Sequence, residues 1–278
     1  MLRQSRRAPQ ATANLIISAA LNVGRKTMKT RTGAFLLHLA ISLAVLLPVL
    51  GWIFYAWYPW PYPALQGAWP MLGMLVLAHL VVGPALTALV YKPGKRGLVF
   101  DLCVIGVLQL AALAWGVHAV EQRRPAWLVF AVDRLNVLTA GEVMGPAPVV
   151  PKAQRVNGPF PVFAEMPVGD ARQRLLQETM FEGLPDLEHR PEFWRPWASG
   201  QGVMLRAAQP ADALVEARPG AAGAVERLAE SAGVPRDRLV FLPVMGRESD
   251  AAALLDSEDA TLIGLVHVDP WLGDDAAE

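Results

Sequence analysis

The chain has 278 residues, with 25 basic and 25 acidic side chains and a formal net charge of zero. Only 18% of its residues are charged, whereas roughly a quarter are charged in an ordinary soluble domain. Its single cysteine, Cys103, excludes internal disulfides, a Cys-x-x-Cys redox pair and a cysteine-rich zinc site.

The first 33 residues contain seven basic residues and no acidic one. Within them Asn14–Leu21 is mildly apolar but too short to span a bilayer. Met28 is followed at once by Lys29, Arg31 and the first long apolar run, as at the start of a short-tailed membrane protein. We therefore expect Met28 to be the natural start and residues 1–27 to be an upstream extension.

Three long runs almost without charge come next. They are Ala34–Tyr58, Trp69–Tyr91 and Leu98–Val120, and the third is interrupted only by Asp101. About 20 apolar residues in a helix cross the hydrocarbon core of a bilayer. The pattern predicts three transmembrane helices in residues 34–120, in preference to three very apolar helices of a globular core.

The basic residues near the ends of these helices predict their orientation. The N-terminal segment 1–33 and the loop Lys92–Arg96 are basic, whereas the loop Pro59–Ala68 has no charge. The N-terminus is therefore expected in the cytoplasm and residues 121–278 in the periplasm, with the helices in the inner membrane. Residues 121–278 hold 15 basic and 24 acidic residues, a net charge of −9, which suits neither nucleic acid nor anionic lipid.

The loop between the first two helices begins with WYPWPYP at residues 57–63. Its prolines exclude a helix interior and a central strand. Aromatic rings with a polar atom favour the membrane–water interface. We expect membrane-interface anchors here, with direct contact to a partner protein as the alternative; the anchors are Trp57, Tyr58, Trp60 and Tyr62.

Polar residues inside the predicted spans are functional candidates by default. They are His38, His79, Asp101, Gln109 and His118. Only His79 lies deep, and at 100° per residue Asp101, Gln109 and His118 do not share one helix face. Helix–helix contacts are therefore favoured over a transport path, although a transporter or sensor subunit using His79 and Asp101 stays open. Gly83-Pro84 predicts a kink or the close approach of a neighbouring helix.

The periplasmic part reads as one α+β domain with an antiparallel sheet and helices on one side. Residues 145–168 are proline-rich and suit an irregular loop. The expected strands are 127–132, 135–138, 239–244, 251–255 and 262–268, and the expected helices are 170–181 and 221–232.

No catalytic or cofactor-binding signature occurs: there is no GxSxG, HExxH, P-loop or GxGxxG. We therefore predict no catalytic residue, cofactor or metal. Asp256, Glu258 and Asp259 lack the spacing of a calcium loop and read as a solvated hairpin tip. Arg195 between Trp194 and Trp197 predicts either a partner-binding cluster or a small aromatic core. The candidates for partner binding are Trp194, Arg195, Trp197 and Trp271.

Several segments together resemble one family. They are WYPWPYP at 57–63, VVGPALTALVYKPGKRGLVFDLCVIGVLQLAAL at 81–113, RPAWLVFAVDRLNVLTAGEV at 124–143, FLPVMGRESDAAALLD at 241–256 and LIGLVHVDPW at 262–271. This series is similar to the bacterial type IV pilin accessory proteins, the TfpX/TfpZ family. The resemblance is close over residues 29–144 and looser at the far C-terminus, and residues 145–240 match only in general character.

The resemblance implies a non-enzymatic role in the type IV pilus system. Its expected partners are a type IV major pilin and the lipid of the inner membrane; no nucleic acid is expected, and the oligomeric state is left open. Members of this family support the stability of a pilin or its assembly into the pilus, which would affect twitching motility. The rival interpretation is a membrane-anchored enzyme acting on envelope material, which needs a convergent polar cluster.

Overall fold

The computed structural model describes residues 30–147 and 158–272. The predicted start at Met28 and the extension 1–27 lie outside the described residues, as does part of the predicted loop 145–168. The chain divides into two compact units: unit 1 comprises residues 1–51 and 71–118, and unit 2 comprises residues 52–70 and 119–278. The domain boundaries predicted at residues 33 and 120 stay predictions.

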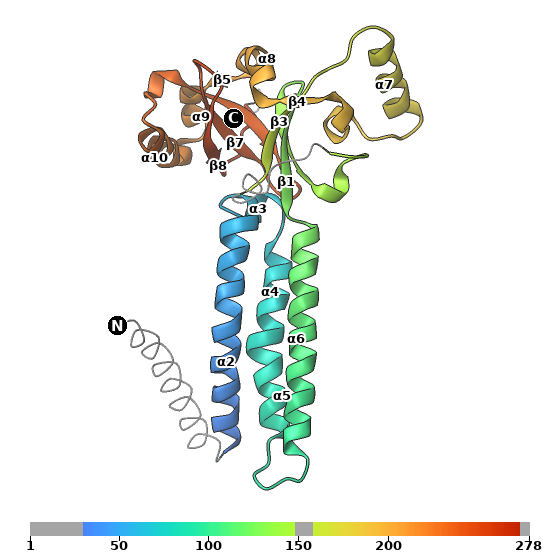
Figure 1. The fold of residues 1–278 in the computed structure, drawn as a ribbon. Helices are drawn as coiled ribbons and strands as arrows, with labels where there is room; N and C mark the ends of the chain where they lie inside the picture. The colour runs from blue at the N-terminus through green and yellow to red at the C-terminus, as the bar shows by residue number, and fades with distance from the viewer. Residues whose placement is uncertain (1–29, 148–157, 273–278) are drawn as a thin grey trace, which may run out of the picture. The chain divides into compact units, whose positions relative to one another are not determined.

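The three predicted apolar helices are confirmed (Figure 1). The first is α2 (Arg31–Trp52), extended by a π-helical turn at Ile53–Trp57. The second consists of α4 (Trp69–Leu77), a π-helical turn at Ala78–Val82 and α5 (Gly83–Val90). The third is α6 (Leu98–Gln122). Each is long and apolar enough to cross a membrane, while insertion and orientation remain predictions.

The second helix changes its winding in the middle, immediately before Gly83-Pro84. Pro84 has no N–H to continue the regular ladder, and such a gap is a common setting for a π-helical turn. Gly83 faces Gln109 of α6 so closely that a Cβ at this position would overlap the amide side chain. The close approach predicted at Gly83 is therefore confirmed.

Unit 2 is built on one sheet of eight strands (Figure 1). Seven lie in the order β4-β3-β1-β2-β6-β7-β8, and β5 pairs with β6. The strands are β1 (Pro125–Ala131), β2 (Arg134–Thr139), β3 (Phe160–Ala164), β4 (Trp194–Pro196), β5 (Gln209–Pro210), β6 (Leu239–Met245), β7 (Ala251–Asp256) and β8 (Leu262–Val266).

The prediction of a purely antiparallel sheet is wrong, because the sheet is mixed. The pairs β1–β3 and β2–β6 are parallel, whereas β1–β2 and the C-terminal meander β6-β7-β8 are antiparallel as expected. After the β1–β2 hairpin the chain returns to the other side of β1, and much later enters β6 beside β2. Parallel neighbours need such long connections, which here carry most of the helices of unit 2.

In the described part of unit 2, helices pack on the sheet in two apolar clusters. In the first, α7 (Asp170–Phe181) and the adjoining segment pack on β1 and β3 through Leu175 and Leu187. In the second, α9 (Ala211–Ala217) and α10 (Ala222–Ala232) cover β6, β7 and β8 through Leu214 and Val225. A short helix, α8 (Gln201–Ala207), places the buried Met204 against Gly200. The sheet is thereby covered by helices contributed from its long connections.

Candidate functional site

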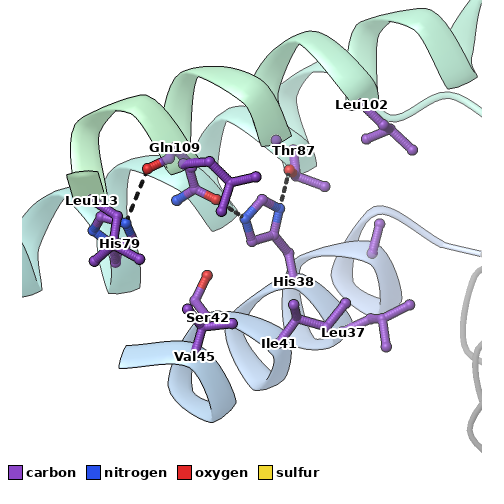
Figure 2. A pocket seen from close by; sticks show the side chains of 13 residues that line it. Leu37, His38, Ile41, Ser42, Val45, His79, Thr87, Leu102, Gln109 and Leu113 are labelled. Carbon is purple, nitrogen blue, oxygen red and sulfur yellow. Dashed lines mark hydrogen bonds between the residues drawn. The ribbon is translucent and has the colours of Figure 1, made fainter. Parts of the chain in front are cut away.

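Unit 1 contains a cavity of about 410 Å³ between its three helices, open on one side (Figure 2). Apolar side chains form most of its wall. The polar residues of the wall come from all three helices: His38 and Ser42 from α2, His79 and Thr87 from the second helix, and Gln109 from α6. Of the predicted intramembrane residues, His38, His79 and Gln109 therefore meet here.

His38 joins two other helices through its ring nitrogens. Its Nε2 bonds to Gln109 Oε1, and its Nδ1 lies 2.6 Å from the hydroxyl oxygen of Thr87. The amide oxygen only accepts, so Nε2 carries the proton, and Nδ1 of the neutral ring accepts from the Thr87 hydroxyl. Gln109 Nε2 in turn donates to the carbonyl oxygen of Ala78 at 3.5 Å. One histidine thus links α2, α5 and α6.

His79 is buried, with 4% of its surface exposed. Its Nδ1 lies 3.0 Å from the carbonyl oxygen of Leu75 and its Nε2 lies 3.2 Å from the carbonyl oxygen of Gln109. Both neighbours only accept, whereas a neutral imidazole has a single N–H. The ring therefore donates to one carbonyl at a time, and a second proton would satisfy both.

Ser42 and Asp101 differ in their partners. Ser42 is 5% exposed and its hydroxyl points into the cavity (Figure 2). Asp101 is not part of the wall; it forms an ion pair with Lys95 at 2.6 Å. The structure therefore brings His38, His79 and Gln109 together. It leaves Asp101 elsewhere in unit 1, paired with Lys95 of the basic 92–96 loop.

The predicted membrane anchors divide into two kinds. Tyr58 and Tyr62 are buried in unit 2, with 0% and 7% of their surface exposed, whereas Trp60 is 66% exposed. Trp57 is half-buried. Burial raises the pKa of Tyr58 to about 12 and also raises the pKa of Tyr62. Membrane anchoring stays a prediction for these residues, and two of them already have a protein environment.

The loop that carries these aromatics is part of unit 2. The phenol of Tyr58 donates to the carbonyl oxygen of Val120 at 3.3 Å. The exposed Trp60 lies edge-to-face with His267, 5.7 Å between ring centroids. Leu65, at the end of α3 (Tyr62–Leu65), accepts from the backbone amides of Arg247 and Glu248, directly after β6. The residues after the first apolar helix are therefore tied to the C-terminal sheet.

The predicted partner-binding cluster does not assemble as one cation–π group. Trp194 is buried and packs on Trp127 at 4.9 Å between ring centroids. Arg195 is exposed and pairs with Glu165 at 3.0 Å. Trp197 is half-buried, and its Nε1 donates to the carbonyl oxygen of Ala260 at 2.9 Å. This supports the aromatic-core interpretation for Trp194 and leaves Arg195 accessible.

Trp271 lies after β8, near the end of the described part of the chain. Its Nε1 donates to Asp250 at 2.7 Å, and the guanidinium of Arg134 lies 5.0 Å from its ring centre. This arrangement provides a cation–π contact at a residue that the sequence did not single out. A partner-binding role for Trp271 stays a prediction.

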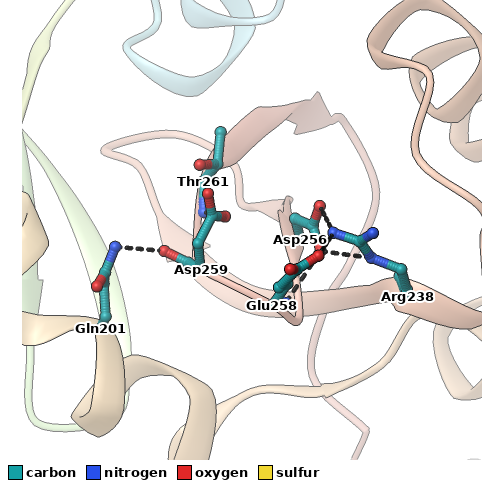
Figure 3. Close-up of polar contacts among 6 residues, drawn as sticks. All are labelled: Gln201, Arg238, Asp256, Glu258, Asp259 and Thr261. Atoms are coloured by element: carbon teal, nitrogen blue, oxygen red, sulfur yellow. Dashed lines mark hydrogen bonds and ion pairs between the residues drawn. The ribbon is translucent and has the colours of Figure 1, made fainter.

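The acidic loop 256–259 makes polar contacts with residues outside it (Figure 3). Arg238 donates to both carboxylate oxygens of Asp256, at 3.1 and 2.6 Å, and also pairs with Glu258. The Glu258 amide and then Arg238 lower the pKa of Asp256. Gln201 donates to the carbonyl oxygen of Asp259 at 2.6 Å. Within residues 30–147 and 158–272, no group of His, Cys, Asp or Glu is placed to hold a metal ion.

Two residues of the unit 1 cavity, Ser42 and Thr87, are not among the residues that the sequence predicts for it, because they are neither ionisable nor amide side chains. Hydroxyl residues are common in membrane helices because they bond within their own helix, so they give a weak signal. Both residues do lie in the predicted apolar runs, Ser42 in the first and Thr87 in the second.

These features define a class: a protein with three helices suited to cross a membrane, an open cavity with a histidine network, and a mixed-sheet domain. The family model for the fimbrial assembly protein FimB matches residues 26–67. A fimbrial assembly protein of serogroups C1 and C2 from Dichelobacter nodosus is 30% identical over 110 residues, which are 39% of this chain and 84% of that protein. The chain belongs to this family of fimbrial assembly proteins.

Longer relatives cover most of both units. The fimbrial assembly proteins of serogroup I and serogroup E1 from Dichelobacter nodosus are 26% and 25% identical over 244 residues. In each case the match spans 84% of this chain and 94% of the relative. No solved structure matches the chain. The resemblance to type IV pilin accessory proteins is thereby confirmed, and a role in pilus assembly follows from the family.

Proposed function

We propose that the protein is a non-enzymatic accessory factor of the inner membrane that binds a type IV major pilin and supports its stability and assembly. The observation that carries this proposal is the extent of the family match. Relatives named as fimbrial assembly proteins align over 84% of the chain, so the likeness takes in the helices of unit 1 and the sheet of unit 2.

The two units suit a partner that has a membrane helix and a periplasmic head. Unit 1 offers an open, largely apolar cavity between its helices. Unit 2 belongs to a segment with a net charge of −9, which favours a basic surface on the partner. Apolar helices gain little free energy from meeting in lipid, so the periplasmic domain supplies most of the specificity.

Co-purification tests this proposal directly. The full chain, extracted in mild detergent from cells that make pili, is expected to bring down the major pilin. Deletion of the gene is expected to lower pilin level, the number of pili and twitching motility. Unchanged pilin and pili in the deletion strain, together with no co-purification, would refute the proposal.

The topology is tested separately. Alkaline phosphatase fused after residue 65 or after residue 272 is expected to be active, because both positions are proposed to be periplasmic. The same enzyme fused after Lys95 is expected to be inactive. The opposite pattern would place unit 2 in the cytoplasm and would contradict its proposed contact with the periplasmic head of the pilin.

A further inference from the structure

We propose that the cavity of unit 1 receives a carboxyl side chain carried by an apolar helix of the partner. The identity of that partner rests on the proposed function, whereas the recognition of an acidic helix rests on the cavity alone. Three features of the cavity support it: the kinds of polar group in the wall, the unused hydroxyl of Ser42 and the number of hydrogen-bond donors at His79.

The polar side chains of the cavity wall are of three kinds. They are two histidines, two hydroxyls and one amide: His38, His79, Ser42, Thr87 and Gln109. Among the residues that the structure describes, no carboxylate contributes to the wall, and Asp101 is paired with Lys95. The wall therefore offers polar groups to a carboxyl group without a like charge that would repel it.

Ser42 supplies a free donor for such a ligand. Its hydroxyl has no hydrogen-bond partner among the residues that the structure describes, although 95% of its surface is covered. In the described part of the chain, no fully buried side-chain oxygen lacks a hydrogen-bond partner. The unpaired oxygen of Ser42 is therefore accessible, and it faces the cavity (Figure 2). A carboxylate oxygen in the cavity accepts this hydroxyl hydrogen, whereas an apolar side chain leaves it unused.

His79 supplies the compensating charge. In the neutral ring, one nitrogen without a hydrogen faces a carbonyl oxygen, which is unfavourable. Transfer of the proton from the O–H of a carboxylic acid to this nitrogen gives a carboxylate and an imidazolium, with no change in total charge. The imidazolium then donates to both Leu75 and Gln109, and the carboxylate accepts from Ser42. The carboxylate and the two carbonyl oxygens that face His79 then all have hydrogen-bond donors.

The opening of the cavity fits a helix better than a polar molecule. Its rim includes Ile41, Val45 and Leu110, which are 57%, 40% and 63% exposed. Ala34 and Gly106 are also in the wall, and small residues of this kind let a neighbouring helix approach closely in membranes. An apolar helix therefore covers the rim while its carboxyl group enters the cavity.

A binding assay with synthetic membrane peptides tests this recognition. The full chain has one cysteine, Cys103, which is exposed on α6 and outside the cavity wall. A donor fluorophore at Cys103 reports binding of acceptor-labelled peptides in lipid nanodiscs. Each peptide is a lysine-flanked leucine–alanine helix of about 20 apolar residues, with Glu, Gln or Leu at its centre.

The Glu peptide is expected to bind at least about tenfold more tightly than the Leu peptide, with Gln between them. Ser42→Ala and His79→Phe are each expected to bring the Glu peptide to within about twofold of the Leu peptide. Ser42→Ala removes one unpaired hydroxyl and is expected to fold normally. The matched control is His118→Phe on α6, which replaces a histidine outside the wall and is expected to keep the preference.

Three outcomes would overturn the inference: equal binding of all three peptides, an undiminished preference in Ser42→Ala and His79→Phe, or no peptide binding. Self-association of the chain that excludes the peptides would also overturn it, and it would be detected as energy transfer between two labelled copies. If pilin co-purifies with the full chain while no peptide binds, the proposed function stands and this inference fails. If the Glu peptide binds through Ser42 while pilin does not co-purify, the inference stands and the proposed function fails.

Discussion

The side-chain amide of Gln66 donates to the backbone carbonyl oxygen of Val137 at 3.1 Å, and both residues are buried. Val137 lies in β2, one residue beyond Asn136, where the pairing of β2 with β6 stops. The amide of Gln66 therefore donates to β2 at the point where β6 ends and no longer pairs with it. The loop between the first two apolar helices is in this way a structural part of the sheet domain.

We expect Gln66→Ala to destabilise unit 2 by about 1–3 kcal/mol, because a buried carbonyl oxygen loses its donor. The measurement is thermal unfolding of the full chain in detergent, followed by near-ultraviolet circular dichroism. Gln201→Ala is the matched control, since the amide of Gln201 also donates to a backbone carbonyl, that of Asp259, but near the surface. Equal effects of the two substitutions would contradict the role assigned to Gln66.

Replacement of the loop aromatics separates packing from membrane anchoring. Tyr62→Ala is expected to destabilise unit 2 by about 3–5 kcal/mol, because a buried aromatic ring leaves a cavity. Trp60→Ala is expected to leave stability within about 0.5 kcal/mol, since this ring is mostly exposed. Both are measured by chemical unfolding in the same detergent. A large loss from Trp60→Ala, with little from Tyr62→Ala, would reverse the assignment.

The contacts of Asp256 predict a dependence of stability on acid. The Glu258 amide and Arg238 lower the pKa of Asp256 in the folded chain, whereas the pKa of an Asp in an unfolded chain is about 3.9. Stability from these contacts is complete above that pH and is lost as the pH falls through the lower folded value. The melting temperature is therefore expected to fall below about pH 4. At pH 7, Asp256→Asn is expected to lower the melting temperature. Below about pH 4, the melting temperature of this variant is expected to fall less than that of the parent chain.

The matched control for this prediction is Asp133→Asn. Asp133 forms an exposed ion pair with its neighbour Arg134 at 2.8 Å, and exposed pairs contribute little to stability. Its replacement is expected to leave the melting temperature and its acid dependence close to those of the parent chain. An acid dependence that is unchanged in Asp256→Asn would contradict the assignment.

The sequence predicts the three apolar helices, α7, α10 and most of the strands because their signals are local, whereas α8 and α9 are not predicted. Absence of charge defined the three apolar helices to within a few residues, and α7 begins and ends where its apolar spacing predicted. The strand β3 lies within residues 145–168, whose many prolines predict an irregular loop. The parallel pairing of β2 with β6 joins residues such as Leu135 and Val244, far apart in the chain, and no local pattern specifies it.

The cavity of unit 1 could be predicted only in part for a related reason. His79 and Gln109 stand out as polar residues in apolar runs, but their meeting depends on the winding of the second helix and on the absence of a side chain at Gly83. The aromatic loop shows the same limit. Tyr58 and Tyr62 carry one signal, an apolar ring with a hydroxyl, which fits a membrane interface and a protein interior equally well.

Gly83 gives the sharpest test of the cavity. A methyl group at this position overlaps the side chain of Gln109, so Gly83→Ala must displace the amide that bonds His38. We expect a destabilisation of about 1–3 kcal/mol from overpacking and loss of the preference for the Glu peptide. Gly73→Ala in α4 is the control, because nothing lies within 4 Å of the added methyl group and alanine favours a helix over glycine. It is expected to keep or raise the stability and to keep the peptide preference; a preference that survives in Gly83→Ala would show that the His38–Gln109 contact does not shape the cavity.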